Sequence, residues 1–181
     1  MEVSIVMKRT IALFCATLIL LFSQGASAET LMSGNEFQIT LPDGWHLLDE
    51  VMLSQIASVL PQTTQQTASI AYSDSGSAIC AFSRPSEGMT MELMSLFQSA
   101  YIARIEKALP FFEMENLITG TTAFSTNKFF YISFTVLETP VWVLYNFTGE
   151  SVITVCTVGM ELVEVTNILS TLTTIPVPAQ Q

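Results

Sequence analysis

Histidine, the side chain that most often serves as a general acid or base, occurs once in this sequence, at His46. Asp43 and Asp49 lie close to it along the chain. An imidazole oriented by a carboxylate can act as a general base toward a serine or threonine hydroxyl, so a small hydrolase centred on His46 is one hypothesis. No G-x-S-x-G pattern singles out a nucleophile, and a histidine on a surface hairpin explains the same residue. We therefore predict no catalytic residues.

Patterns that bind metals or cofactors are also missing from the sequence. A zinc site requires several His or Cys ligands, whereas residues 29–181 contain one histidine and two cysteines. Neither the D-x-D-x-D-G spacing of a calcium loop nor a Gly-rich phosphate loop is present. The closest carboxylates, Asp49 with Glu50 and Glu113 with Glu115, are typical of solvated helix starts or strand edges. We predict no metal and no cofactor.

Two thiols remain as candidates for covalent chemistry. Cys80 and Cys156 each lie in an apolar stretch that reads as a strand. They could form a disulfide only if those strands are neighbours, because bridged Cα atoms lie within about 7 Å of each other. Two buried free cysteines are the alternative. The sequence leaves both open.

The first 28 residues have the pattern of a cleaved signal peptide. A basic pair at 8–9 precedes an apolar run over 11–22, and the A-S-A sequence at 26–28 fits a cleavage site. A start at Met7 would make the leader's first region wholly basic. The apolar run is too short to span about 30 Å of hydrocarbon, so we expect no permanent membrane span after cleavage. The pattern predicts a periplasmic or secreted protein.

The remaining chain, residues 29–181, is expected to form one globular domain and is strongly acidic. Without the leader the cationic side chains fall from six to four and the carboxylates from sixteen to fifteen, which gives a net charge of −11. Nucleic-acid binding needs clustered Lys and Arg residues to displace counterions, so this charge excludes that class. It also disfavours anionic membrane surfaces and suits a cationic partner.

Hydrophobic periodicity predicts how this domain begins. Residues 37–41 alternate between apolar and polar, as in a half-buried strand. A Pro-Asp-Gly turn follows at 42–44, and residues 45–48 can return as a second strand. In this hairpin Trp45 would pack into the core as an anchor rather than bind a ligand.

The rest of the domain reads as a mixture of helices and strands. The expected elements are a helix over 49–60, a polar loop over 61–69, a hairpin around 73–76, a helix over 91–109 capped by Thr90, three strands between 128 and 158, and a helix over 160–174. The core-facing residues expected on the second of these helices include Leu93, Leu96, Phe97, Tyr101 and Ile105, and on the third Leu162, Val165, Leu169 and Leu172. The first of the three late strands is apolar on both sides, which predicts a sheet covered on both faces.

One motif and this element order resemble the PsbP-like family. The motif F-x-I-x-L-P-x-G-W consists of Phe37, Ile39, Leu41, Pro42, Gly44 and Trp45. The family includes the extrinsic PsbP subunit of photosystem II and bacterial envelope proteins such as DcrB. The resemblance implies an α+β fold in which an antiparallel sheet is packed between helices as an α/β/α sandwich. It also implies a binding or assembly role without catalysis, and it carries over no catalytic residue because the shared positions are structural.

These observations favour an exported, non-enzymatic protein that binds another envelope protein. An immunity or inhibitor protein against a basic toxin or enzyme is the first alternative, because electrostatic steering would speed such an association. The hydrolase centred on His46 is the second. A small apolar ligand held between helix and sheet would also fit the Met- and Phe-rich elements, although core packing explains the same residues. The oligomeric state is left open by the sequence.

Overall fold

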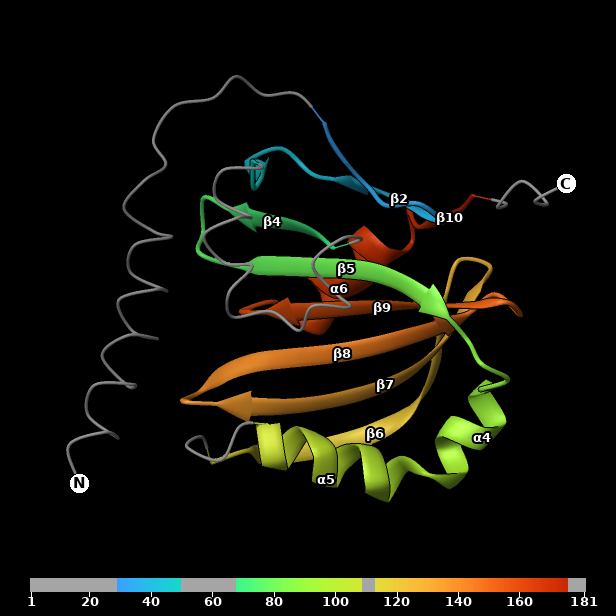
Figure 1. Cartoon of the computed structure of the whole chain (residues 1–181). Helices are drawn as coiled ribbons and strands as arrows, with labels where there is room; N and C mark the ends of the chain where they lie inside the picture. Colours follow the sequence, from blue (N-terminus) through green and yellow to red (C-terminus); the bar gives the residue numbers. More distant parts are fainter. Residues whose placement is uncertain (1–28, 50–67, 109–112, 176–181) are drawn as a thin grey trace, which may run out of the picture.

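The centre of the molecule is an antiparallel sheet of seven strands in the order β3-β4-β5-β9-β8-β7-β6 (Figure 1). The computed structural model describes residues 29–49, 68–108 and 113–175. In chain order the strands of this sheet are β3 Trp45–Leu47, β4 Ser69–Ser73, β5 Ala78–Pro85, β6 Glu115–Phe124, β7 Asn127–Val136, β8 Thr139–Phe147 and β9 Ser151–Val158. A smaller sheet has the order β1-β2-β10, with β1 Thr30–Ser33, β2 Phe37–Leu41 and β10 Thr173–Thr174.

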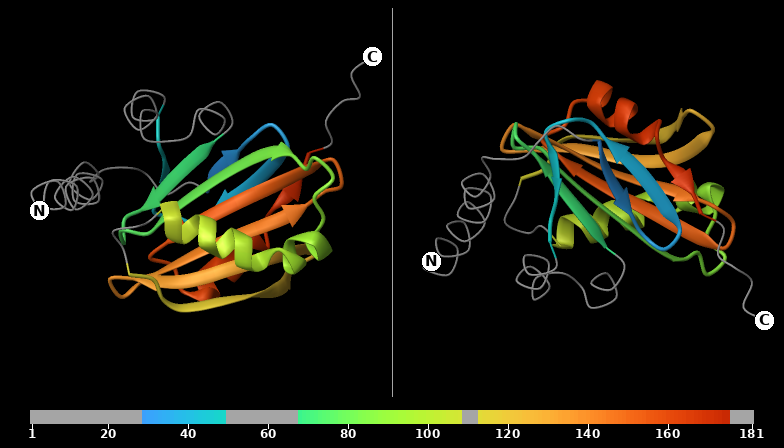
Figure 2. Two further views of the ribbon diagram at one scale, coloured as in Figure 1. Left: turned by 60° about the horizontal axis from the view of Figure 1, so that its bottom comes forward. Right: turned by 90° about the horizontal axis from the view of Figure 1, so that it is seen from above.

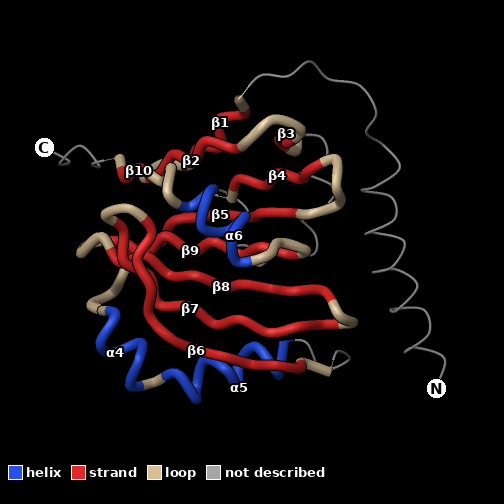
Figure 3. Tube along the Cα trace, turned by 180° about the vertical axis from the view of Figure 1, so that it is seen from behind, coloured by secondary structure: helices blue, strands red, loops and turns tan. Residues whose placement is uncertain are grey.

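Both faces of the large sheet are covered (Figures 2 and 3). On one face lie α6 (Leu162–Leu169) and the smaller sheet, and on the other lie α4 (Met91–Leu96) and α5 (Gln98–Ala108). Each face has its own hydrophobic core. This arrangement confirms the predicted α+β class, with an antiparallel sheet between helical layers. Among the described residues, no helix is both long and apolar enough to cross a membrane.

The strand β7 explains why two cores form. Phe130, Ile132 and Phe134 belong to the core beneath α4 and α5. Phe129 belongs to the opposite core, beneath α6. Because side chains alternate between the two faces of a strand, a strand that is apolar throughout needs cover on both sides, as its sequence indicated.

The first predicted hairpin is wrong in its pairing. In β2 the side chains of Phe37, Ile39 and Leu41 are fully buried, as the alternation predicts. However, β2 pairs with β1 and β10, while β3 pairs with β4. The turn at 42–44 therefore carries the chain from the small sheet to the large one. Sequence analysis missed this because it identified neither β1 nor β10, the strands that take up both edges of β2.

The helix predicted over 91–109 is two helices in the structure. Thr90 caps α4 as expected, since its Oγ1 accepts a hydrogen bond from the N–H of Leu93 at 3.3 Å. The helix α4 ends at Leu96 with Phe97 as its C-cap, and α5 begins at Gln98. The change of direction separates the two parts of the expected apolar stripe, so Leu93, Leu96 and Phe97 are exposed, while Met94, Tyr101 and Ile105 reach the core.

Other boundaries also differ from the sequence predictions. The last helix is shorter than 160–174 because the chain turns into β10, and Leu162 is half exposed, whereas Val165, Leu169 and Leu172 are buried. Leu137 occupies the turn from β7 to β8 with φ 51° and is 83% exposed, so β7 ends at Val136. The sequence did not predict β6. The predicted leader, nearly all of the helix over 49–60 and most of the loop over 61–69 lie outside the described residues.

Candidate functional site

A pocket of about 400 Å³ lies where the small sheet, one edge of the large sheet and α6 meet. Its walls come from three segments of the chain: the turn that joins β2 to β3, the turn that joins β4 to β5, and one side of α6. The described residues that line it are Pro42, Asp43, Gly44, Trp45, Ser73, Asp74, Ser75, Glu164, Asn167 and Ile168. Part of the sequence motif, Pro42, Gly44 and Trp45, therefore borders the pocket, whereas Phe37, Ile39 and Leu41 lie in the core.

A hydrogen bond between main-chain groups joins the first two segments. The N–H of Asp74 donates to the carbonyl oxygen of Gly44 at 2.9 Å. Gly44 has φ 80°, a conformation that favours glycine. A Cβ on Gly44 would lie 3.3 Å from Oδ2 of Asp74. The residue is therefore suited to its place both by its backbone angle and by the closeness of the second turn.

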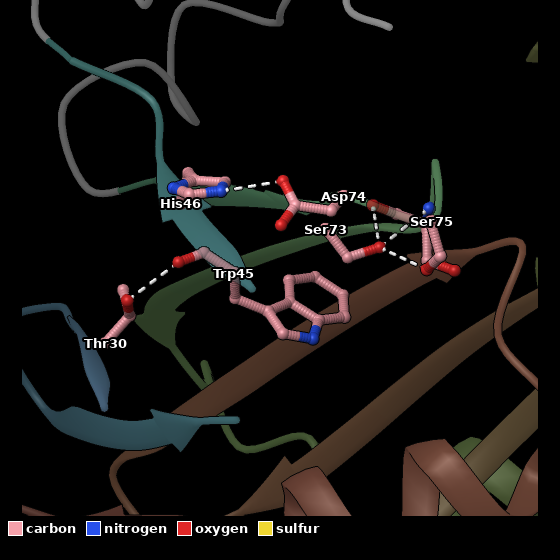
Figure 4. A network of polar contacts seen from close by, with 7 residues as sticks. Thr30, Trp45, His46, Ser73, Asp74 and Ser75 are labelled. Atoms are coloured by element: carbon pink, nitrogen blue, oxygen red, sulfur yellow. Dashed lines mark hydrogen bonds and ion pairs between the residues drawn. The ribbon is translucent and has the colours of Figure 1, made fainter. Parts of the chain in front are cut away.

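His46 is held against the same aspartate (Figure 4). Its Nε2 lies 2.9 Å from Oδ1 of Asp74, and the side chains are 28% and 62% exposed, respectively. The imidazole also lies near the ring of Tyr72, with 5.3 Å between centroids. This geometry follows from strand pairing, because His46 is opposite Tyr72 in the β3–β4 ladder and Asp74 follows directly after β4.

Trp45 lines the pocket but is mostly buried. Its side chain is only 8% exposed and belongs to the core that contains Phe37 and Leu41. The main chain of Trp45 is fixed as well, since its carbonyl oxygen accepts a hydrogen bond from Oγ1 of Thr30 in β1 at 2.8 Å (Figure 4). Although the predicted hairpin does not form, the structure places this indole in the core.

The pocket is acidic. It is lined by three carboxylates, those of Asp43, Asp74 and Glu164, and none of the described lining residues is Lys or Arg. Burial, followed by the charges of Asp74 and Asp49, raises the pKa of the neighbouring Tyr72 to about 12. Glu164 is also fixed in place, because its Oε2 accepts the N–H of Glu161 at 3.0 Å in the capping box of α6.

The hydroxyl groups at this site belong to the turn between β4 and β5. The Oγ atoms of Ser73 and Ser75 hydrogen-bond each other at 2.7 Å (Figure 4). Oγ of Ser73 also accepts the N–H of Ser77 at 3.0 Å. These bonds commit both hydroxyls to stabilising the turn. The His46–Asp74 pair has the first feature of a hydrolytic triad, an oriented imidazole, but the serines beside it have a structural role.

The chemistry available to such a pocket is the binding of cations. Carboxylates form charge-assisted hydrogen bonds with ammonium and guanidinium groups. Among the described residues, no group of three or more His, Cys, Asp or Glu side chains is arranged to hold a metal ion. An organic cation, such as a Lys or Arg side chain, can form such bonds with the acidic residues of the pocket.

The remaining residues named from the sequence lie elsewhere. Glu113 and Glu115 are exposed just before and at the start of β6, and neither lines the pocket. Cys80 and Cys156 face each other across β5 and β9 and are free thiols in the structure. Sequence analysis missed Asp74 and Glu164, since strand register and helix packing alone bring them beside the turn at 42–44.

Comparison with known proteins identifies the architecture. No family model matches the sequence, and no match was found among curated proteins. Among solved structures, the chain is similar to the solution structure of cyanobacterial PsbP (CyanoP) from Synechocystis sp. PCC 6803. The match has a TM-score of 0.60 at 12% identity and covers 86% of this chain and 99% of that one. The chain has a PsbP-like fold.

A second structural neighbour agrees with the PsbP-like arrangement over part of its own length. It is a crystal structure from Bacteroides thetaiotaomicron VPI-5482, with a TM-score of 0.52 and 10% identity. The match covers 83% of this chain and 50% of that one. Identities this low show the PsbP-like fold alone.

Proposed function

We propose that this protein is an exported, non-enzymatic accessory protein of the cell envelope that binds another protein. We further propose that the acidic pocket receives a cationic side chain of this partner. The leader pattern at 1–28 supports export. The PsbP-like neighbours support an accessory or binding role rather than catalysis.

The observation that carries the proposal is the convergence of three acidic residues on one pocket. Asp43, Asp74 and Glu164 come from three separate segments, so their convergence depends on the fold rather than on local sequence. The pocket lies in a chain whose charge without the leader is −11. That field would attract a basic partner and raise its association rate, while the pocket would fix the orientation of the complex.

Comparative capture from an envelope fraction tests this proposal. The wild-type protein and a pocket variant, Asp43→Asn with Asp74→Asn and Glu164→Gln, are immobilised side by side. The amides retain the shape and the acceptor oxygens, and Gln can replace Glu in a capping box. We expect a basic protein to be retained by the wild type and lost from the pocket variant.

A control variant separates the pocket from net charge. The control variant carries Glu106→Gln, Glu113→Gln and Glu150→Gln. It loses as many negative charges as the pocket variant, three, but from exposed positions that do not line the pocket. It should retain the captured protein. If both variants lose the captured protein equally, overall charge rather than the pocket accounts for binding. If the wild type itself retains no protein, the proposed function is contradicted.

The acidic pocket also suits the second candidate, an immunity or inhibitor protein against a basic toxin or enzyme. The two candidates predict different partners for the same surface. If the captured protein has a toxic or enzymatic activity, titration with this protein should abolish that activity in the inhibitor case. In the accessory case the activity should persist in the complex.

A further inference from the structure

Cys80 and Cys156 lie where the two halves of the large sheet join. β5 is the last strand of the β3-β4-β5 half, and β9 is the first of the β9-β8-β7-β6 half. Their antiparallel register places Cys80 directly opposite Cys156. Such opposed residues have Cα atoms about 4.5–5.5 Å apart and project from the same face of the sheet. A disulfide requires Cα atoms about 4.4–6.8 Å apart, so the backbone already has the required spacing.

The two thiols share an apolar environment. Their neighbours along the strands, Ile79, Ala81 and Val155, point into the core beneath α6, so the cysteines project from the opposite face. Burial raises the pKa of Cys80 to about 11 and that of Cys156 to about 12. The second largest cause at Cys156 is the charge of Cys80, which is consistent with the closeness of the two sulfur atoms.

We propose that Cys80 and Cys156 form a cross-strand disulfide in the exported protein, which fastens β5 to β9. Residues 29–181 contain no third cysteine that could compete for either thiol. Exported proteins meet an oxidising environment in which disulfides persist. The proposal rests on the register of the two strands and on export, and it is independent of what the acidic pocket binds.

The oxidant is the disulfide of an exported thiol oxidase, and the reaction is thiol–disulfide exchange. One cysteine thiolate attacks an oxidant sulfur, which gives a mixed disulfide and releases one oxidant thiolate. The second cysteine thiolate then attacks the sulfur of the first, which releases the other oxidant thiolate. The protein loses two electrons and two protons, and the oxidant gains them as a dithiol.

The raised pKa of each thiol should make this exchange slower in the folded protein than in the unfolded chain. At neutral pH the folded, reduced protein has very little thiolate, and thiolate is the attacking species. We therefore expect the bridge to form more readily while the chain is still folding and its thiols have ordinary acidity. Reduced protein that has already folded should react slowly with glutathione disulfide, and the same protein should be oxidised promptly when it refolds in its presence.

Peptide mapping without reduction tests the bridge directly. The full chain is expressed with its own leader, isolated from the exported fraction, denatured, alkylated and digested with trypsin. Because Pro85 follows Arg84, the peptide that contains Cys80 should end at Arg104, and the peptide that contains Cys156 should begin at Phe129. We expect these two peptides to be linked and to separate on reduction. Alkylation of both cysteines without prior reduction would overturn the proposal.

Melting temperatures provide a second readout that does not depend on digestion. Reduction should lower the melting temperature by roughly 5–15 °C. Cys80→Ala and Cys156→Ala should each lower it, and the double variant should lose far less than the sum of the two losses, because either change already removes the bridge. Additive losses, with no effect of reductant on the wild type, would show two independent buried thiols.

Discussion

The carboxylate of Asp74 lies 2.9 Å from Nε2 of His46, although 28 residues separate them along the chain. The main-chain N–H of the same Asp74 donates to the carbonyl oxygen of Gly44 at 2.9 Å. Through these two bonds the turn between β4 and β5 holds the turn that precedes β3. The acidic pocket thus has a fixed wall, and its geometry depends on a few identifiable contacts.

Gly44→Ala should disturb this wall. A non-glycine residue in the left-handed region costs about 1–2 kcal/mol, and the new Cβ would also press on Asp74 at 3.3 Å. Gly149→Ala is the matched control, since Gly149 has φ 96° and a Cβ added there would meet nothing within 4 Å. Denaturant unfolding should show the larger loss for Gly44→Ala. Equal losses would mean that the contact with Asp74 contributes nothing.

Trp45→Ala should leave the protein marginally stable or unfolded. Loss of so large a buried aromatic costs about 3–5 kcal/mol, against a total stability of about 5–15 kcal/mol for a typical protein. Thermal melts followed by circular dichroism measure the effect. If Trp45 served mainly to bind a ligand, binding would weaken while the melting temperature stayed within about 2 °C of the wild type, and the structural assignment would be wrong.

Alkaline pH should lower the free energy of unfolding through ionisation of Tyr72. Burial and the nearby carboxylates raise its pKa from 10.0 to about 12 in the folded state, so folding favours the neutral phenol. This contribution is complete below pH 10 and is lost as the pH rises toward about 12. Urea unfolding of wild type and Tyr72→Phe should therefore show a steeper loss for the wild type over this interval. If stability falls equally with pH in the wild type and in Tyr72→Phe, the raised pKa of Tyr72 is contradicted.

Screens for esterase, peptidase and glycosidase activity should find none in the wild type. The serines next to Asp74 hydrogen-bond each other and the turn, which leaves the oriented imidazole of His46 with a structural role. An activity that His46→Ala abolishes while the melting temperature is maintained would restore the hydrolase hypothesis and remove the basis for a non-enzymatic function.

The sequence predicted the elements whose patterns are local. The alternation of Phe37, Ile39 and Leu41 predicted β2, and the apolar faces of the late strands predicted a covered sheet. The pairing of β2 was not predictable in this way, because β10 has only two residues, which are too few to show a period. The break at Phe97 was missed as well, since the apolar spacing continues through it, and only the change of helix direction exposes Leu93.

Less of the pocket than of the fold could be predicted from the sequence. His46 was an evident candidate as the one histidine, but its partner Asp74 lay within a turn sequence that needed no further explanation. Glu164 is one of many carboxylates and is set apart only by the packing of α6 beside the turn at 42–44. Tertiary contacts, which have no local signature, bring these groups together.

The dissociation constant of the captured partner tests the central claim, that the acidic pocket binds a cationic group. It should be measured with the purified partner for the wild type, the pocket variant and the charge-matched control. Because each charge-assisted hydrogen bond contributes about 1.5–3 kcal/mol, the pocket variant should bind at least roughly 10-fold more weakly, while the control stays close to the wild type. Equal dissociation constants for the pocket variant and the control would contradict the account.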